Sequence, residues 1–333
     1  MRVAVLGLGM WGFCLARLLA KNGHTIMGWT KEEELMALLQ RGEDHPHLPH
    51  SCRGLSIQLV DSIEEAVRDA DVIVESVTTG GLRPILTLLR KQYSALPAPF
   101  ILTSKGIEQK THITPPDCVM EVFGPDAKTQ IAMLSGPSFA AEVANNLPTA
   151  VVCGAYEPTI SEMVIELFSS NSFRVYANYD VRGVALGGAL KNIIAIACGI
   201  AEGLGFGTGA RATLVTRGLH EMVKLAVADG CHAQTLYGLS GLGDLYLTCS
   251  SPLSRNFRFG QLLSTGLTRA DAEKQIGMVV EGAYTCQAAY ELGKQHAIQM
   301  PITEAVYGIL EGSLPPQSLV TKLMEKSILE EHL

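Results

Sequence analysis

The 333-residue chain has few charged residues, few aromatic residues and no closely paired cysteines. Charged residues make up 18% of the sequence, and the formal net charge is −7 at pH 7. Such an acidic chain argues against a nucleic-acid-binding groove, although a local basic pocket can still exist on it. The eight cysteines lie singly, without a C-x-x-C pair, which predicts reduced core residues rather than a disulfide framework.

We also find no apolar run that we expect to reach the length of about 20 residues that a membrane-spanning helix needs. The N-terminal segment "MRVAVLGLGMWGFCLARLLA" resembles a signal peptide, with an early arginine and an apolar body. No clear cleavage site follows it, and its glycine spacing has a better explanation. We therefore predict a cytoplasmic protein without membrane insertion, whose N-terminus belongs to the fold.

Apolar material, in contrast, is plentiful. Hydrophobic residues make up 47% of the sequence, enough for packed interiors throughout. A chain of 333 residues exceeds the size at which one core usually keeps growing, which predicts two domains.

The first 23 residues combine a strand, a glycine-rich turn and a helix. The apolar run "RVAVLG" is typical of a buried parallel strand, and Gly7, Gly9 and Gly12 follow it before leucines at helical spacing. "HTIMGW" then predicts a second strand. This order is the dinucleotide-binding fingerprint, in which the glycines permit a tight turn, close approach of the pyrophosphate and close packing of the helix. A glycine-rich turn without a ligand is the alternative.

The residues after the second strand bear on the choice of cofactor. Lys31 suits the 2′-phosphate of NADP, whereas an acidic side chain there would hold the ribose 2′-OH of NAD. Glu32 to Glu34 follow immediately, and strand ends predicted from sequence are uncertain by a few residues. We favour NADP(H) and leave NAD(H) open.

Further buried strands are predicted at "DVIVESV", "FILTSKG", "QIAMLSGPSF", "TAVVCGA" and "FRVYAN", with helical or turn-forming segments between them. Ser62 and Glu65 predict a helix-capping box. The alternation indicates a doubly wound sheet with mostly right-handed crossovers, and it stops near Asp180. We predict an α/β fold, with a Rossmann-type dinucleotide-binding domain over residues 1–180 and an all-helical substrate-binding domain over residues 181–333.

Two other features could suggest ligand sites. "HPHLPHSC" places His45, His47, His50 and Cys52 together, but its two prolines make it an extended loop and no carboxylate has an obvious pairing with it. We predict a surface loop and no bound metal. The glycine-rich segment "GLGFGTGA" at 203–210 follows a helix, which indicates a flexible connection between helices that lines a cleft.

The segment "GGALKNIIAIACGI", residues 187–200, contains a single charge, Lys191. On a helix its neighbours at three and four positions are small, namely Gly187, Gly188 and Ala195, with Cys198 a little further away. Small neighbours leave an opening beside the lysine. Two other interpretations stay open: the side chain can run along the helix surface to water, or the glycines can allow another helix to pack closely.

Several long segments, taken in order, resemble those of the bacterial NAD(P)-dependent glycerol-3-phosphate dehydrogenases. They are "GLGMWG", "TSKGIE", "LSGPSFAAEV", "VALGGALKNIIAIACGI", "GLSGLGDLYLTC", "SRNFRFG", "VVEG" and "MPITEAVY". The resemblance runs from residue 2 to about residue 309. It implies interconversion of sn-glycerol 3-phosphate and dihydroxyacetone phosphate, usually run as the reduction that supplies phospholipid synthesis.

The resemblance also implies roles for individual residues. It makes Lys191 the proton donor and acceptor at the carbonyl, with Lys105 and Asp244 as the other catalytic residues. The residues that it implies for substrate binding are Lys105, Gly136, Ser138, Asn192, Asp244, Thr248 and, at the substrate phosphate, Ser254, Arg255 and Asn256. Those that it implies for cofactor binding are Gly7, Gly9, Met10, Trp11, Gly12, Lys31, Lys105, Ala140, Arg255, Val279 and Glu281.

Three positions depart from the family pattern. Met10 and Trp11 stand where the family often has Ser and Tyr, and Lys31 stands where His or Arg is usual. All three lie in the cofactor half, so they bear on cofactor preference rather than on the chemistry.

The implied chemistry agrees with elementary electrostatics. A ketone that accepts hydride develops alkoxide charge, so a positioned cation and a proton source both lower the barrier. Lys191 can be both. Burial and the like charge of Lys105 would lower its pKa from about 10.4, whereas contact with Asp244 would keep the ammonium charged. Reduction requires the charged lysine, so oxidation would need a higher pH.

Two rival functions remain open. A related two-domain NADP-dependent reductase of another small hydroxy compound, such as a hydroxy acid or ketopantoate, would share the fingerprint and a lysine in a helical domain. The "SRN" segment favours a phosphorylated substrate instead. A non-enzymatic NAD(P) sensor would bind cofactor but would not need a lysine, an aspartate and an arginine. Base rates favour a homodimer.

Overall fold

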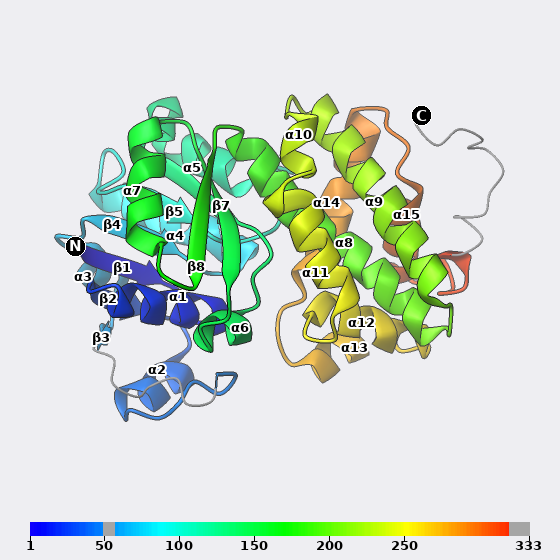
Figure 1. The fold of residues 1–333 in the computed structure, drawn as a ribbon, viewed down its shortest axis with the longest axis horizontal. Helices are drawn as coiled ribbons and strands as arrows, with labels where there is room; N and C mark the ends of the chain where they lie inside the picture. The colour runs from blue at the N-terminus through cyan, green and yellow to red at the C-terminus, as the bar shows by residue number, and fades with distance from the viewer. Residues whose placement is uncertain (49–56, 320–333) are drawn as a thin grey trace. The chain divides into compact units, whose positions relative to one another are not determined.

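The computed structural model describes residues 1–48 and 57–319 (Figure 1). Its contacts divide the chain into two compact units. The first comprises Met1–Lys105 with Ile113–Ala185, and the second comprises Gly106–His112 with Leu186–Leu333. The first unit is an α/β sheet domain and the second is helical, which confirms the predicted fold class.

The first unit is built on an eight-stranded sheet with the order β3-β2-β1-β4-β5-β6-β7-β8. Its strands are β1 Arg2–Leu6, β2 Thr25–Trp29, β3 Ile57–Leu59, β4 Val72–Glu75, β5 Phe100–Leu102, β6 Ile131–Ser135, β7 Thr149–Ala155 and β8 Phe173–Asn178. The six strands β3, β2, β1, β4, β5 and β6 are mutually parallel. The chain adds strands outward from β1 first on one side and then on the other, as in doubly wound nucleotide-binding sheets.

Helices cover both faces of the sheet, because alternate residues of its buried strands point to opposite sides. On β1, Val3 and Val5 pack into one cluster with α1 (Met10–Lys21) and α7 (Pro158–Phe168). The opposite face meets α3 (Ile63–Val67) and α5 (Pro115–Phe123). The remaining helices of this unit are α2 Glu33–Gln40, α4 Thr79–Gln92 and α6 Ala140–Ala144, with a 3₁₀ turn η1 at Pro125–Gln130.

Most predicted elements are found, and two details differ. The short strand β3 was not predicted, since only three residues pair there. β7 runs antiparallel to β6, and the segment 136–148, which contains the five-residue helix α6, connects the two strands. The Ser62 side chain accepts a hydrogen bond from the Glu65 N–H at 3.1 Å, as the predicted cap requires.

The second unit is mainly helical in the part of it that the structure describes. It contains most of α8 (Val181–Gly203), followed by α9 Thr208–Ala228, α10 Ala233–Leu236, a π-helical turn η2 Leu239–Gly243, α11 Asp244–Ser250, α12 Arg255–Ser264, α13 Arg269–Ile276, α14 Glu281–Gln295 and α15 Pro301–Leu310. The glycine-rich segment at 203–210 joins α8 to α9, as predicted.

α8 is the buried centre of this unit, and between its charged ends, Arg182 and Glu202, its only polar side chains are those of Lys191 and Asn192. Its 23 residues are long and apolar enough to cross a membrane by length and composition, with a mean hydropathy of 1.8. The expectation that no apolar segment reaches this length is therefore wrong. The apolar window of α8 is entirely buried inside the protein, and no other helix in the described ranges passes the same criterion.

Backbones cross closely where α8 meets α12. A Cβ added to Gly199 would lie 2.0 Å from the Phe257 carbonyl oxygen, and one added to Gly260 would lie 2.1 Å from that of Ile196. Neither position can carry a side chain at this spacing. The glycines therefore admit a neighbouring helix, as one interpretation of this segment proposed.

The cysteines of the described ranges are buried and form no disulfide bond. This holds for all seven in the described ranges: Cys14, Cys118, Cys153, Cys198, Cys231, Cys249 and Cys286. Burial raises the pKa of the Cys14 thiol and of the Cys153 thiol to about 12, so both are protonated and unreactive near neutral pH. Cys52 lies outside the described residues.

Candidate active site

The glycine-rich turn between β1 and α1 has the geometry that the fingerprint needs. Gly7 adopts φ +101°, and a Cβ there would lie 2.6 Å from the Ser76 carbonyl oxygen. A Cβ on Gly12 would lie 1.9 Å from the Gly7 carbonyl oxygen, so the helix can begin this close to the strand only with glycine. A Cβ on Gly9 would meet nothing within 4 Å. The backbone at Gly9 is therefore open to a ligand.

The N-terminus of α1 is suited to phosphate. Gly9 is its N-cap residue, and no side chain caps the first turn. Uncapped N–H groups at the positive end of a helix favour an anion. The indole Nε1 of Trp11 is buried without a hydrogen-bond partner, so this turn has an unused donor. Together with the open backbone at Gly9, these features fit a dinucleotide pyrophosphate.

The basic and the acidic side chains that could select between NADP and NAD follow β2, and both are exposed. Lys31 and the glutamates 32–34 face solvent, while Thr30 is buried and its hydroxyl accepts a hydrogen bond from the Glu32 N–H at 3.3 Å. A basic and an acidic side chain therefore both follow the strand, and the preference for NADP(H) stays a prediction.

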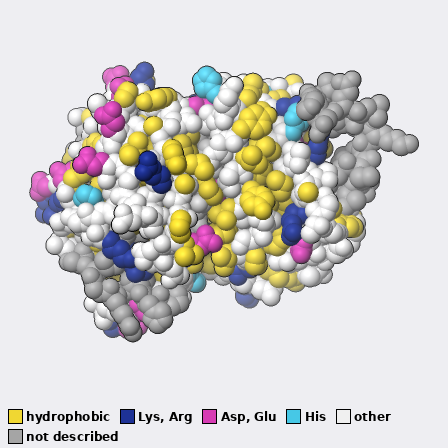
Figure 2. All heavy atoms as spheres, viewed as in Figure 1, with side chains coloured by type: hydrophobic (Ala, Val, Ile, Leu, Met, Phe, Trp, Pro, Cys, Tyr) yellow, Lys and Arg dark blue, Asp and Glu magenta, His cyan; other side chains and the backbone are white. Residues whose placement is uncertain are grey.

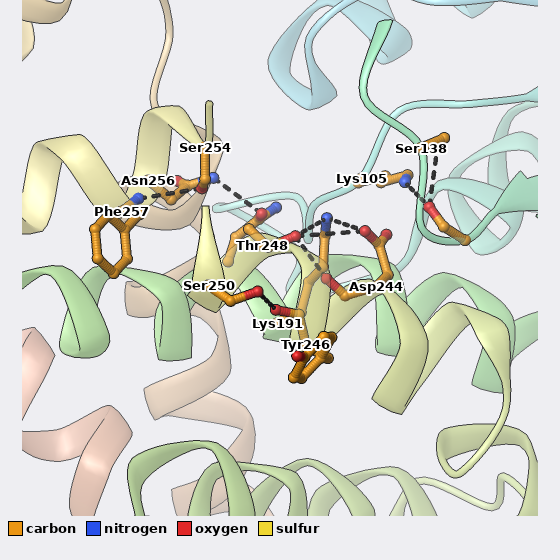
Figure 3. Close-up of polar contacts among 12 residues, drawn as sticks. Lys105, Ser138, Lys191, Asp244, Tyr246, Thr248, Ser250, Ser254, Asn256 and Phe257 are labelled. Atoms are coloured by element: carbon orange, nitrogen blue, oxygen red, sulfur yellow. Dashed lines mark hydrogen bonds and ion pairs between the residues drawn. The ribbon is translucent and has the colours of Figure 1, made fainter. Parts of the chain in front are cut away.

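A second polar group of the first unit gathers after β5 and β6. The Lys105 ammonium donates to the Gly136 carbonyl oxygen at 3.0 Å, and the Ser138 hydroxyl donates to the same oxygen at 3.1 Å (Figure 3). Ala140 begins α6 and is buried. The segment "SGPSFA" and the lysine of "TSKG" are thus brought together, as their joint assignment to one site requires.

Lys191 lies in the interior of the second unit rather than on a helix surface. It is 7% exposed, and its Nζ donates to Asp244 Oδ1 at 2.6 Å and to the Thr248 hydroxyl at 2.7 Å (Figure 3). That hydroxyl in turn donates to the Asp244 carbonyl oxygen at 2.6 Å. The interpretation in which the lysine runs along a surface to water is therefore wrong.

Local structure explains why these three side chains meet. Asp244 and Thr248 are four residues apart on α11, so they share one face of that helix. A Cβ on Gly187, one turn before Lys191 on α8, would lie 2.8 Å from the carbonyl oxygen of Ser240. Glycine at 187 therefore lets the turn that precedes α11 approach α8. A carboxylate in direct contact stabilises the charged form of a buried lysine.

Asn192 and Asn256 form a second buried polar contact beside the lysine. Asn256 Nδ2 donates to Asn192 Oδ1 at 2.9 Å, and the Gly282 N–H donates to Asn256 Oδ1 at 3.0 Å. The Asn256 amide thus links α8, α12 and the start of α14. It sits where the resemblance implies phosphate binding, and both ends of its amide already have protein partners.

The rest of the "SRN" segment begins α12. The Ser254 hydroxyl accepts a hydrogen bond from the Phe257 N–H at 3.2 Å, so Ser254 is the N-cap. Arg255 follows and is partly buried. Burial lowers the pKa of its guanidinium from the usual value, and the nearby Glu281 carboxylate opposes that shift. Val279, also expected near cofactor, is 43% exposed.

The histidine loop contains a buried structural residue. His45 is 3% exposed, so the prediction of a surface loop is wrong at this position. Its Nδ1 accepts from the His47 N–H at 3.2 Å, and its Nε2–H donates to the Leu8 carbonyl oxygen at 3.2 Å. Its ring also stacks on Phe13 at 5.4 Å. Burial and the neighbouring His47 lower the His45 pKa to about 4.

His45 therefore contacts the glycine-rich turn as a neutral ring, through the Leu8 carbonyl oxygen and the Phe13 ring. Its sequence context did not reveal this role. The only signal was the apolar Leu48 nearby, which is also buried. His50 and Cys52 lie outside the described residues. Within the described ranges, no group of three His, Cys, Asp or Glu side chains could hold a metal ion.

One buried acid was also missed. Glu75 ends β4 and is fully buried, with its carboxylate accepting hydrogen bonds from the loops after β4 and β5. The available signal was the position of Glu75 within the apolar run "DVIVESV", which is predicted to be a buried strand. A carboxylate is rarely buried unless it is paired, so an acid there indicates a specific set of partners.

Comparisons with known proteins point to one family. The family models for the NAD-dependent glycerol-3-phosphate dehydrogenase N-terminus and C-terminus match residues 2–161 and 180–321. A protein named glycerol-3-phosphate dehydrogenase [NAD(P)+] from Protochlamydia amoebophila is 52% identical, covering 100% of this chain and 99% of that protein. One of the same name from Chlamydia caviae is 47% identical, with the same coverage.

Solved structures give the same result. The crystal structure of glycerol-3-phosphate dehydrogenase from Coxiella burnetii superposes with a TM-score of 0.90 at 35% identity, over 98% of this chain and 99% of that one. A D-mandelate dehydrogenase bound to NADH reaches a TM-score of 0.63 at 13% identity, over 96% and 99% of the two chains, which shows a shared fold alone. On the two family models and these relatives, the chain belongs to the NAD-dependent glycerol-3-phosphate dehydrogenase family.

Proposed function

We propose that the protein interconverts sn-glycerol 3-phosphate and dihydroxyacetone phosphate by hydride transfer with NAD(P)(H). The observation that carries this function is the buried ammonium of Lys191, held by Asp244 and Thr248 in the helical unit. A glycine-rich turn of fingerprint geometry in the sheet unit fits the dinucleotide. Family membership and the names of relatives at about half identity support the same reaction.

Lys191 is the general acid in the reductive direction. As the carbonyl oxygen gains negative charge, the ammonium stabilises that charge and then donates its proton. Asp244 keeps the ammonium charged before the reaction, and the Thr248 hydroxyl fixes its direction by accepting one of its hydrogens. In the oxidative direction the neutral amine removes the hydroxyl proton, so oxidation is favoured by higher pH.

The substrate phosphate is bound by "SRN" at the start of α12. The Arg255 guanidinium offers a planar pair of donors to phosphate oxygens. The first turn of the ten-residue helix α12 adds the positive end of its dipole. Ser254 and Asn256 contribute mainly by shaping this turn, because their side chains already bind Phe257, Asn192 and Gly282.

Residues of the sheet unit hold the dinucleotide, which supplies the hydride when bound. Gly7, Gly9 and Gly12, with the N–H groups of Met10 and Trp11, surround the pyrophosphate. Lys31 contacts the adenosine ribose. Lys105 contacts substrate and nicotinamide, and Gly136, Ser138 and Ala140 line the same place. The family resemblance also assigns Val279 and Glu281, which belong to the helical unit, to the cofactor.

The biological setting follows from this reaction. The enzyme supplies glycerol 3-phosphate for phospholipid synthesis in the cytoplasm, without membrane insertion and without a nucleic-acid partner. It acts as a homodimer, a proposal supported by hydrophobic side chains gathered over α10 and α11 (Figure 2). Tyr237, at the C-terminal end of α10, is 57% exposed, and Tyr246 on α11 is 66% exposed. Light scattering on the purified protein measures the oligomeric state.

An absorbance assay of reduced nicotinamide tests the function. We expect oxidation of NADPH, NADH or both with dihydroxyacetone phosphate, and far slower oxidation with unphosphorylated dihydroxyacetone, ketopantoate or benzoylformate. Preference for one of the last two would identify the protein as a reductase of another hydroxy compound. Dinucleotide binding without reduction of any of these ketones would favour the sensor.

A further inference from the structure

Glu75 is an acidic residue inside the core of the sheet unit, at the end of β4. Its side chain is fully buried and accepts four hydrogen bonds. Oε1 accepts from the Val77 N–H at 2.8 Å. Oε2 accepts from the Ser104 hydroxyl at 3.1 Å, the Thr103 N–H at 3.3 Å and the Ser104 N–H at 3.5 Å. A single carboxylate therefore joins the loops that follow two neighbouring strands.

The loop on the β4 side packs directly against the glycine-rich turn. A Cβ added to Gly7 would lie 2.8 Å from Val77 Cγ1, and one added to Gly12 would lie 2.9 Å from Ser76 Cβ. The loop and the turn are therefore in van der Waals contact, with no room for a side chain at either glycine. The hydrogen bond from the Val77 N–H to Glu75 therefore holds the loop against which the glycine-rich turn packs.

The loop on the β5 side leads to the other end of the proposed cofactor site. Thr103 and Ser104, which donate to Glu75, immediately precede Lys105. The Lys105 ammonium then binds the Gly136 carbonyl oxygen at 3.0 Å. All these residues lie in the first unit, so one rigid contact sets the spacing between the glycine-rich turn and Lys105.

We propose that Glu75 is a positioning residue for the dinucleotide site, holding the glycine-rich turn and Lys105 at the spacing that binding requires. The proposal rests on the proposed function, in which these two elements contact the dinucleotide. Every partner of the carboxylate is a donor, so the ionised form satisfies the site and an amide cannot replace it. Burial raises the Glu75 pKa to about 7, although its hydrogen bonds oppose the shift, so the test is run above that pH.

Glu75→Gln tests the proposal, with Glu221→Gln as a matched control. Glu221 is also a buried carboxylate with a pKa raised to about 7, and it accepts from the Ile302 N–H, the Thr303 N–H and the Thr303 hydroxyl in the helical unit. Both variants place an amide NH₂ against donors, so both lose stability. Only Glu75→Gln should also weaken dinucleotide binding.

The measurement is a fluorescence titration of each purified protein with NADPH and with NADH, without ketone. We expect the Kd of Glu75→Gln to rise about tenfold, and that of Glu221→Gln to stay within about twofold of wild type. Equal changes in the two variants, or an unchanged Kd in Glu75→Gln, would overturn the positioning role. Because no ketone is present, the result stands even where the proposed reaction fails in the absorbance assay.

Ser104→Ala covers the case in which Glu75→Gln does not fold. It removes one hydroxyl donor and leaves the carboxylate and both loops in place. The Kd should rise in the same direction by a smaller factor, about two- to fivefold. A Kd equal to that of wild type in this variant, with Glu75→Gln unfolded, would also contradict the proposal.

Discussion

Lys191 and Asp244 are 53 positions apart in the sequence, yet Lys191 Nζ and Asp244 Oδ1 lie 2.6 Å apart. The two side chains are 8% and 1% exposed, so water does little to screen them. Removing one partner of such a pair leaves an uncompensated charge in the interior. Variants at these positions therefore need a measurement of folding beside the measurement of activity.

Changing Lys191 to Ala removes the proposed acid. We expect kcat to fall by a factor of about 10² to 10⁴, the usual contribution of a positioned proton donor, with dinucleotide Kd nearly unchanged. Steady-state kinetics and fluorescence titration measure the two quantities. Lys274→Ala, at an exposed position on α13, is the control and should retain full activity. Near-normal turnover in Lys191→Ala would refute the assignment.

Asp244→Asn keeps the shape of the pair and removes its negative charge. The buried ammonium then loses the partner that stabilises it, so Lys191 gives up its proton at a lower pH than in wild type. The high-pH limit of ketone reduction should therefore move to lower pH. A pH profile of kcat for reduction checks this, and an unmoved limit would show that the carboxylate does not control the charge of the lysine.

Arg255→Gln tests phosphate recognition. Loss of a charge-assisted pair of hydrogen bonds should raise the KM for dihydroxyacetone phosphate by about 10- to 100-fold. The KM for unphosphorylated dihydroxyacetone should change little. Arg258→Gln, exposed on the same helix, is the matched control. An effect confined to the dinucleotide KM would contradict phosphate binding by Arg255.

Glu221 should make stability depend on pH. Burial raises its pKa to about 7, above the value of about 4.5 in the unfolded chain. Ionising Glu221 therefore costs more in the folded chain than in the unfolded chain, so its contribution to stability is complete below pH 4.5 and is lost as pH rises to about 7. Urea unfolding at pH 5 and pH 8 checks this against Glu221→Gln. The stability of wild type relative to the variant should be larger at pH 5.

Gly187→Ala tests the close packing of α8 against the turn before α11. The new Cβ would lie 2.8 Å from a backbone oxygen of Ser240, so the turn must move and Asp244 with it. We expect a loss of about 1–3 kcal/mol in unfolding free energy, together with a lower kcat. Gly209→Ala is the control, because a Cβ there meets nothing within 4 Å. Equal stability of the two variants would contradict the close approach.

The sequence predicted the elements with strong local patterns. The turn at Gly7, the strands of the sheet core and the helical second half follow from periodicity and glycine spacing alone. It could not predict the antiparallel pairing of β7 with β6, which is a tertiary contact that no local pattern reports. The apolar length of α8 was underestimated, because Lys191 and Asn192 interrupt its apolar run in the sequence.

The candidate site was predicted mostly through family resemblance. Local spacing placed Lys191 among small residues, but only tertiary structure shows that Asp244 and Thr248 hold its ammonium. Glu75 was not singled out, and the structural role of His45 was missed, because most of their partners are backbone groups, which side-chain patterns do not report. Asn256 was assigned to phosphate, and the structure gives its amide two protein partners.

The crossing of α8 and α12 through Gly199 and Gly260 constrains how this lineage can change. Neither glycine touches a reacting atom in the proposed mechanism, and each faces backbone across the contact. A mutational scan selected for cellular abundance alone should therefore reject substitutions at both positions. The close contact at these two glycines holds α8, the helix that carries the proposed acid, against α12. This requirement for glycine concerns folding, so it would remain even if catalysis were no longer needed.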